Sequence, residues 1–207
     1  MISKKLFGLV AILLFSSLPS STAAESYLFP VAGCKVTYSK YHHDYPATDI
    51  QAKQGCAFVA TVSGVIEDVN LKDKWSGKTN LGQDRGGLSV SYIGVDGVRY
   101  YGSHLSKVEP GIAPGVQVVA GQKLGEVGST GSARGTKPHL HFGISYPTMP
   151  GDWEIRRGVI WPWKYLDAWR AGENLSPVKA INRAARRLRN KKAPSFLGAS
   201  NKQVGFS

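Results

Sequence analysis

Short runs of strand-forming residues, separated by glycine-containing turns, fill the chain from about residue 27 to residue 146. Apolar and polar side chains alternate within these runs, which is typical of antiparallel strands with one buried face. Asp96 and Gly97 form a favoured two-residue turn between two such runs, so a hairpin is expected there. The polar, aperiodic residues 72–87 are expected to form a long loop. The sequence therefore predicts a mainly β fold with antiparallel sheets.

The first 24 residues have the pattern of an export signal. Lys4 and Lys5 precede an apolar run of ten residues, and small residues follow. This is typical of a secretory signal peptide, here cleaved after Ala24; a membrane span needs about 20 apolar residues. We expect an exported protein, in the periplasm or outside the cell, with one domain at residues 25–174 and an extension at 175–207.

Aromatic residues and then basic residues predominate after Pro150. Residues 161–173 hold three tryptophans and a tyrosine in a helix-like stretch. We expect this stretch to cap the sheet; an exposed surface that stacks on sugars is the alternative. In the extension, Ser176 is a candidate N-cap, Pro177 suits the first helical position, and an apolar stripe follows at Val178, Ile181, Ala185 and Leu188. The extension is thus predicted to be a basic amphipathic helix followed by a loose tail.

The net charge of +12 is concentrated in this extension. Residues 175–207 contain eight lysines and arginines and no acidic residue, whereas residues 25–174 are nearly balanced. The helix is expected either to lie on an anionic wall or membrane surface or to dock through its apolar stripe. A nucleic-acid partner is not expected, because export is predicted and the body is nearly neutral. The sequence does not indicate an oligomeric state.

Two cysteines, Cys34 and Cys56, occur in this chain. Oxidising compartments favour their pairing, and such a disulfide stabilises by roughly 3 kcal/mol on the loop-entropy account. Neither cysteine lies in a recognisable catalytic context. We predict a disulfide between them.

Only five histidines are present, and two of them lie in "PHLHFGI", residues 138–144. In a strand, His139 and His141 project to one face, whereas Leu140, Phe142 and Ile144 project to the other. His104 follows a predicted strand in "YYGSHLS", and Asp49 stands in "YPATDI". Two histidines, one aspartate and water satisfy tetrahedral zinc. The remaining histidines are then available for proton transfer.

The ordered segments "HHDYPATDIQAKQGCAFVATVSGVI", "YYGSHLS" and "VVAGQKLGEVGSTGSARGTKPHLHFGI" resemble the lysostaphin-type zinc endopeptidases, also called LytM domains. The resemblance covers residues 41–146. It implies the antiparallel β fold of this family, a duplicated hybrid motif, with a short C-terminal helical extension in this chain. It also implies one zinc ion, with Asp49 and His141 as ligands and His104 and His139 as catalytic residues.

The first motif departs from the usual H-x-G-x-D of this family. Counting back four residues from Asp49 lands on Tyr45 instead of a histidine. We place the first zinc ligand on His43, because even spacing in an extended segment favours it, with His42 as the alternative and Tyr45 as a remote one; Pro46 disturbs strict alternation. Asp44 is expected at the surface or beside a histidine that it orients.

The resemblance implies hydrolysis of peptide bonds in the cross-links or stem peptides of bacterial peptidoglycan, which would be the main partner. Some LytM-like domains lack zinc ligands and act as non-catalytic activators of cell-wall amidases. That role is the alternative here, because the first motif is altered.

Overall fold

The computed structural model describes residues 26–149 and 151–192. The predicted signal peptide and the predicted loose tail, residues 193–207, lie outside these residues. The strands are β1 (Val31–Ala32), β2 (Thr37–Tyr38), β3 (Thr48–Gln51), β4 (Ala57–Val59), β5 (Gly64–Asn70), β6 (Leu88–Gly94), β7 (Arg99–Leu105), β8 (Lys107–Val108), β9 (Gln117–Val118), β10 (Lys123–Glu126) and β11 (His139–Ser145). The helices are the 3-10 turns η1 (Gly82–Asp84) and η2 (Gly131–Ala133) and the α-helices α1 (Trp153–Arg156), α2 (Trp163–Arg170) and α3 (Val178–Lys192).

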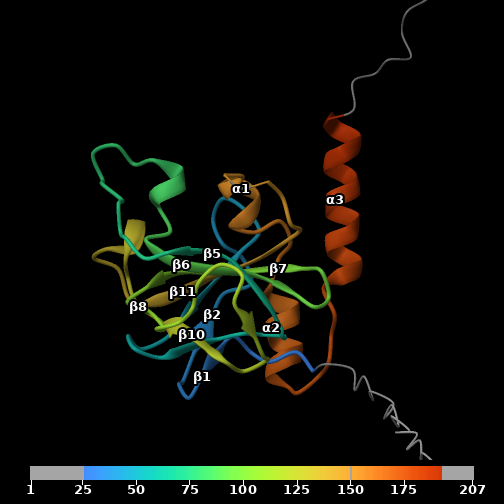
Figure 1. The fold of residues 1–207 in the computed structure, drawn as a ribbon, viewed down its shortest axis with the longest axis horizontal. Coiled ribbons are helices and arrows are strands. Elements are labelled where there is room, and N and C mark those ends of the chain that lie inside the picture. Colours follow the sequence, from blue (N-terminus) through green and yellow to red (C-terminus); the bar gives the residue numbers. More distant parts are fainter. Residues whose placement is uncertain (1–25, 150, 193–207) are drawn as a thin grey trace, which may run out of the picture.

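The described strands form two antiparallel sheets (Figure 1). The larger sheet has the order β2-β3-β11-β7-β6-β5-β9, and the smaller has the order β1-β4-β10-β8. The predicted hairpin is present, because β6 pairs with β7 across the turn at Gly97, which has a positive φ of 75°. The predicted mainly β, antiparallel fold is therefore confirmed.

The core includes side chains from both sheets. One face of β11 is therefore occupied by core packing, and only its opposite face can hold functional side chains. Leu140, Phe142 and Ile144 of β11 are fully buried in it, together with Phe58 of β4 and Leu124 of β10. The alternation predicted for β11 is confirmed. Its histidines consequently project to the face opposite the core.

The stretch of aromatic residues folds into α2, which caps one end of the core. Trp169 stacks on Tyr27 at 5.4 Å between ring centroids and lies edge-on to Tyr100 and Phe142 at 6.4 Å each. Trp169 is 4% exposed, so it is a core residue, not part of a sugar-stacking surface.

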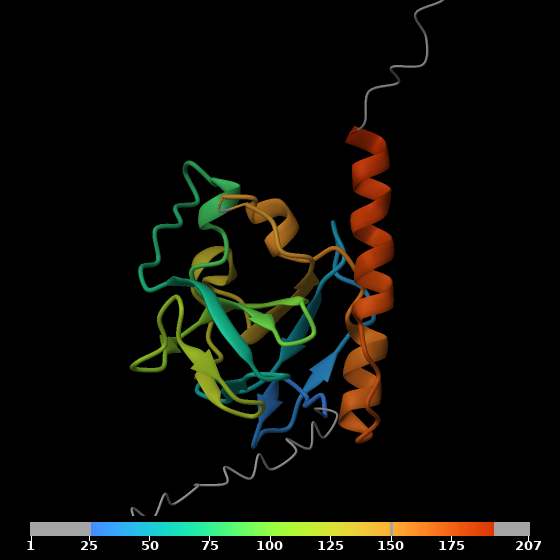
Figure 2. The same ribbon diagram turned by 45° about the vertical axis from the view of Figure 1, so that its right-hand side comes forward.

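The predicted amphipathic helix is present as α3. Figures 1 and 2 both show α3 standing along one side of the β body, with its far end projecting past the sheets. The Oγ of Ser176 accepts a hydrogen bond from the N–H of Val178 at 3.3 Å, and Ile181 is buried against the core. Farther along, Ala185 and Leu188 are only half-buried. No helix in the described part of the chain is long and apolar enough to span a membrane.

Candidate active site

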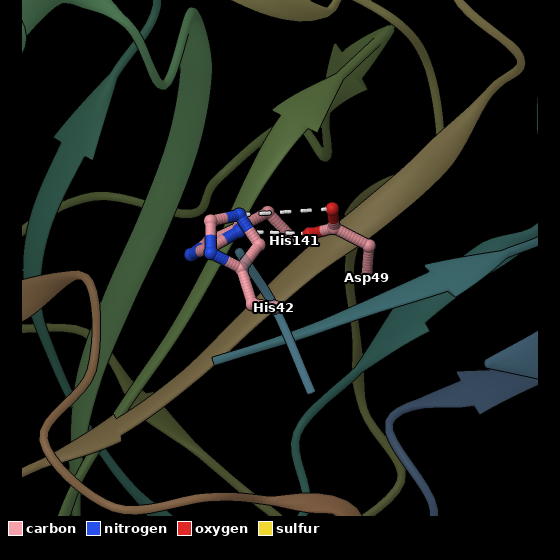
Figure 3. A group of neighbouring side chains, drawn as sticks. All are labelled: His42, Asp49 and His141. Atoms are coloured by element: carbon pink, nitrogen blue, oxygen red, sulfur yellow. Dashed lines mark hydrogen bonds and ion pairs between the residues drawn. The ribbon is translucent and has the colours of Figure 1, made fainter. Parts of the chain in front are cut away.

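Asp49 and His141 meet because β3 and β11 are paired in register. His141 lies opposite Asp49, and His139 lies opposite Gln51. Residues opposite one another in antiparallel strands project to the same face. The Nδ1 atom of His141 is 2.9 Å from Oδ1 of Asp49 (Figure 3). The sheet register thus brings together two of the predicted ligands that are far apart in the sequence.

His42 completes this group from the segment that precedes β3. Its Nε2 lies 3.8 Å from Oδ2 of Asp49. One donor atom from each of His42, Asp49 and His141 lies within 4.8 Å of the other two. His43 is exposed, and its ring contacts that of His42 with 4.6 Å between centroids. The structure thus brings together Asp49, His141 and His42, the alternative ligand, whereas His43, the preferred one, lies outside this group.

A bend explains why the spacing argument favoured His43, which lies outside the group. Residues 43–46 form consecutive bends, and the regular strand begins only at Thr48. Alternation of side chains holds only in extended chain, so counting in twos from Asp49 fails across Pro46. Tyr45, the remote alternative, instead places its hydroxyl 3.4 Å from Nε2 of His141, and Asp44 is exposed.

The main chain of Arg157 determines which nitrogen of His141 faces the aspartate. The carbonyl oxygen of Arg157 lies 3.1 Å from Nε2 of His141. A carbonyl oxygen can only accept, so Nε2 carries a proton; Nδ1 then either holds a second proton shared with Asp49 or presents its lone pair to a metal ion. Gly143 permits this approach, because a Cβ at that position would lie 2.3 Å from the Arg157 oxygen.

The donor set fits a zinc ion. An Nδ1 lone pair and a carboxylate oxygen 2.9 Å apart repel unless they share a cation, which is either a proton or a metal ion. Two imidazoles and one carboxylate are the ligands of many catalytic zinc sites, which keep a further position open. A carbonyl that holds the other nitrogen of a ligating histidine is also usual at such sites.

His104 and His139 lie beside this group on β7 and β11. The ring centroid of His104 is 5.0 Å from that of His139 and 5.9 Å from that of His141. Nδ1 of His104 donates to the carbonyl of Thr130, and Nδ1 of His139 donates to that of Lys137, each at 2.8 Å. Nε2 of both rings is therefore a free acceptor in the neutral state.

The backbone of His104 is strained. Its φ is +63°, a left-handed conformation that residues other than glycine rarely adopt. The N–H of His104 is held by the carbonyl of Gly86 at 2.8 Å. Such outliers concentrate at functional sites, where the surrounding structure maintains them.

Burial favours the neutral form of two imidazoles of the site, those of His104 and His42. It lowers the pKa of His104 to about 3, with repulsion from His141 and His139 adding to the effect. Burial, followed by repulsion from His141, lowers the pKa of His42 to about 4. For Asp49, burial acts to raise the pKa, but the close contact with His141 outweighs it and holds the pKa below its usual range. The site thus offers an anionic carboxylate at Asp49 and neutral imidazoles at His42 and His104.

A comparison with protein families matches residues 43–153 to Peptidase family M23, which is more than half of the chain. The chain belongs to Peptidase family M23. The match contains Asp49, His104, His139 and His141, and it begins one residue after His42. The predicted resemblance to lysostaphin-type peptidases is confirmed.

Two named peptidases are similar to this chain. The L-Ala–D-Glu endopeptidase of Bacillus subtilis is 30% identical over 135 residues, which are 62% of this chain and 36% of that relative. The chain therefore spans little more than a third of the length of this curated relative. Lysostaphin from Staphylococcus simulans, an antimicrobial peptidase, is 25% identical with a TM-score of 0.50, over 74% of this chain and 58% of that one.

A second solved structure supports the M23 fold alone. It comes from Ruminococcus gnavus and has been proposed to be a glycyl-glycine endopeptidase. Its identity to this chain is 21% and its TM-score is 0.52, over 72% of this chain and 62% of that one.

The M23 site opens into a cleft whose walls the sequence patterns did not reveal. One wall comes from the loop at residues 72–87 and the other from α1, and the two meet where Trp153 packs on Gly82. Beside the histidines, the cleft is lined by Tyr45, Arg85, Trp153, Arg156 and Arg157. The length of the loop was a signal for function, but no motif marked the arginines.

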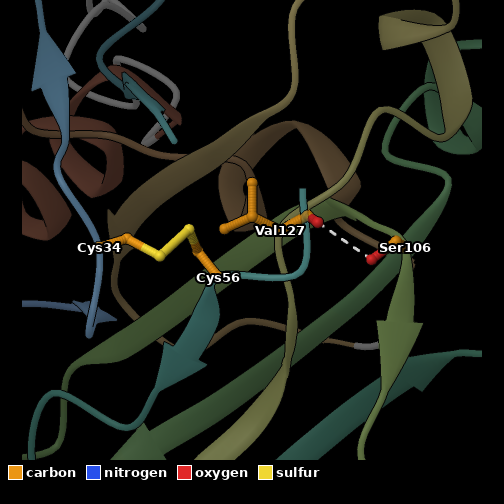
Figure 4. Close-up of a disulfide and its surroundings, with 4 residues drawn as sticks. All are labelled: Cys34, Cys56, Ser106 and Val127. Carbon is orange, nitrogen blue, oxygen red and sulfur yellow. Dashed lines mark hydrogen bonds between the residues drawn. A yellow bond between two sulfur atoms is a disulfide. The ribbon is translucent and has the colours of Figure 1, made fainter. Parts of the chain in front are cut away.

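The predicted disulfide is present and lies behind the M23 site. Cys34 and Cys56 are bonded, with their Cα atoms 6.0 Å apart (Figure 4). The N–H of Val127 donates to the carbonyl of Cys56 at 2.8 Å, and the Val127 carbonyl accepts from the Ser106 hydroxyl at 3.0 Å. The residue after Val127 accepts from the backbone N–H of His139. The disulfide thus supports the segment that leads to a predicted catalytic histidine.

Proposed function

We propose that this chain is a zinc-dependent endopeptidase that hydrolyses peptide bonds in the cross-links or stem peptides of bacterial peptidoglycan. The observation that carries the proposal is the convergence of His42, Asp49 and His141 beside two buried histidines, His104 and His139. Membership of family M23 and the endopeptidase relative support the same substrate class.

In this proposal, His42, Asp49 and His141 hold one zinc ion. Zinc in such a site acts as a Lewis acid toward a peptide carbonyl and makes water more acidic. Asp49 supplies the negative charge that favours a divalent cation, while the Arg157 carbonyl keeps His141 in the tautomer that can ligate through Nδ1.

His104 and His139 move protons in the same proposal. Each ring donates Nδ1–H to a main-chain carbonyl, so its Nε2 can accept a proton from the attacking water. The imidazolium formed can then donate that proton to the departing amine. The anchoring carbonyls also fix the two rings in place, which reduces reorganisation during the reaction.

The test is incubation of the zinc-loaded protein with peptidoglycan of two cross-link types, followed by mass spectrometry of the soluble products. We expect new amino termini at one defined bond, and none with His141→Ala. If zinc binds but neither wall yields new termini, the enzyme proposal fails. The alternative, a non-catalytic activator, would then be examined by adding a cell-wall amidase and measuring its activity.

We also propose that the protein acts outside the cytoplasm, beside an anionic wall or membrane. The disulfide and the signal-like residues 1–24 support export. For the surface, the support is the cationic side of α3, where the exposed basic side chains are Lys179, Arg183, Arg186, Arg187 and Arg189. Fractionation of cells tests the location. Cosedimentation with anionic and neutral vesicles, and with purified wall, tests the surface, and binding that does not weaken as salt is added would contradict it.

A further inference from the structure

Arg157 lies in the wall of the cleft, and its guanidinium contacts two aromatic rings. Its central carbon is 3.8 Å from the ring centroid of Tyr45 and 4.9 Å from that of Trp153. The residue follows α1 directly and is half-buried. The two ring contacts restrict the guanidinium, so its N–H groups are pre-organised for a planar partner.

This cation has no acidic partner among the described residues. The neighbouring Arg156 pairs with Asp68, and the buried Arg99 pairs with Glu67. Arg157 has no such ion pair, and its Nε is buried without a hydrogen-bond partner in the described structure. A partly desolvated charge that lacks a counter-ion is costly, so an arriving carboxylate would be stabilised there.

The rest of the cleft also has more cationic than acidic side chains. Arg85 on the opposite wall is exposed, and its Nε donates to the Asn80 side chain, not to a carboxylate. Among the described residues that line this cleft, Asp44 alone is acidic, and its side chain is exposed. The cleft therefore offers guanidinium groups at positions that a bound peptide would pass on its way to the histidines.

We propose that Arg157 binds a free carboxylate of the substrate, so that the substrates are stem peptides carrying an acidic residue and not neutral glycine bridges. A guanidinium can bind a carboxylate through two parallel N–H···O bonds, which adds orientation as well as affinity. A glycine bridge has no side-chain carboxylate for this contact. The inference rests on the proposed peptidase function and names the substrate class of that site.

The test compares two synthetic stem peptides that differ only at one group. One contains a γ-linked D-glutamate with its free α-carboxylate, and the other carries the carboxamide there. We expect the wild-type protein to favour the acid by about tenfold to a hundredfold in kcat/KM. Arg157→Gln should bring that ratio close to one, and Arg157→Lys should keep part of it. Arg186→Gln on α3 removes the same charge far from the cleft and should leave the ratio at the wild-type value.

The ratio separates recognition from a structural role, because a structural defect would lower the rate for both peptides alike. The inference is overturned if Arg157→Gln retains the wild-type preference, or if a pentaglycine substrate is cleaved as well as the acid. Binding of both peptides to the metal-free protein, measured by calorimetry, provides a readout without turnover. Preferential binding of the acid that depends on Arg157, without hydrolysis by the zinc-loaded protein, would reject the peptidase and support the contact. Hydrolysis of both peptides without that preference would support the peptidase and reject the carboxylate contact.

Discussion

Asp49 and His141 are opposite each other on adjacent antiparallel strands, and their side chains touch across the pair. A shift of β3 against β11 by a single residue would send one of the two side chains to the other face of the sheet. The same shift would expose Ile50, which is fully buried. The hydrophobic core therefore enforces the alignment on which the proposed zinc site depends.

The two adjacent histidines before β3 should differ in their effect on metal binding. We expect His42→Ala to weaken zinc affinity by about a hundredfold or more, because it removes a donor from the group. His43→Ala should retain the wild-type affinity, because that side chain is exposed. Calorimetric titration of both variants with zinc is the measurement. A larger loss of zinc affinity in His43→Ala than in His42→Ala would identify His43 as the ligand.

Substitution of Gly143 should disturb the metal site without touching a ligand. A Cβ there would collide with the Arg157 carbonyl, which must move away from Nε2 of His141. For Gly143→Ala we expect zinc affinity to fall by about 10- to 100-fold and stability to fall by about 1 to 3 kcal/mol.

Ser145→Ala is the matched control for that change. Ser145 lies two residues farther along β11, on the same face, and it already has a Cβ. Its hydroxyl is buried without a partner in the described structure, so its loss should cost little. If both variants bind zinc like the wild type, the carbonyl of Arg157 does not orient the ligand.

The remaining histidines should affect turnover more than metal binding. His104→Gln and His139→Gln each remove a group that can accept and return a proton, a contribution of about 10²- to 10⁴-fold in kcat. Zinc content, measured by atomic spectroscopy, should remain at the wild-type level in both. Loss of zinc together with activity would mean that these residues act as ligands.

The metal-free protein should lose stability as the pH is lowered from about 6.5. His104 has a pKa of about 3 when folded and an ordinary value of 6.5. Between these values the unfolded chain binds a proton that the folded chain does not, so unfolding becomes more favourable as pH falls. His42 acts in the same direction.

Thermal unfolding between pH 7.5 and pH 4.5 measures this slope. His104→Gln should show a shallower fall in Tm with pH than the wild type, and His43→Gln, at an exposed position, is the control. Equal slopes for the wild type and His104→Gln would contradict the assignment.

Removal of the disulfide should change the environment of His139 in the candidate site as well as lower the stability of the fold. Cys34→Ser with Cys56→Ser should lower the free energy of unfolding by roughly 3 kcal/mol. Because Cys56 contacts Val127, whose neighbour holds the backbone of His139, we also expect a shift in the NMR signals of that histidine. An unchanged His139 signal would confine the role of the disulfide to stability.

The sequence could predict the parts of the site that follow regular periodicity. His139 and His141 share a face because β11 is an uninterrupted strand, and Leu140 and Phe142 fill the core as alternation requires. The place of Asp49 came from the resemblance to known peptidases, and the register then explains its contact with His141.

The missed features depend on irregular backbone. The bend before β3 brings His42, and not His43, close to Asp49 and His141. No alternation rule applies across such a bend. The contact from Arg157 is made by a main-chain carbonyl, which any residue possesses, so it leaves no sequence motif. Gly143 was the available signal, because a glycine inside a strand often marks close approach by another segment of backbone.

Arg157 contributes to the site through two chemically independent parts of one residue. Its carbonyl faces His141, whereas its side chain faces the cleft. Substitution of the side chain leaves the main-chain carbonyl in place. A change at this position can therefore alter which substrates the cleft binds without altering the geometry of the proposed metal site. An engineered change of specificity can thus start at this residue without replacing any of the proposed metal ligands.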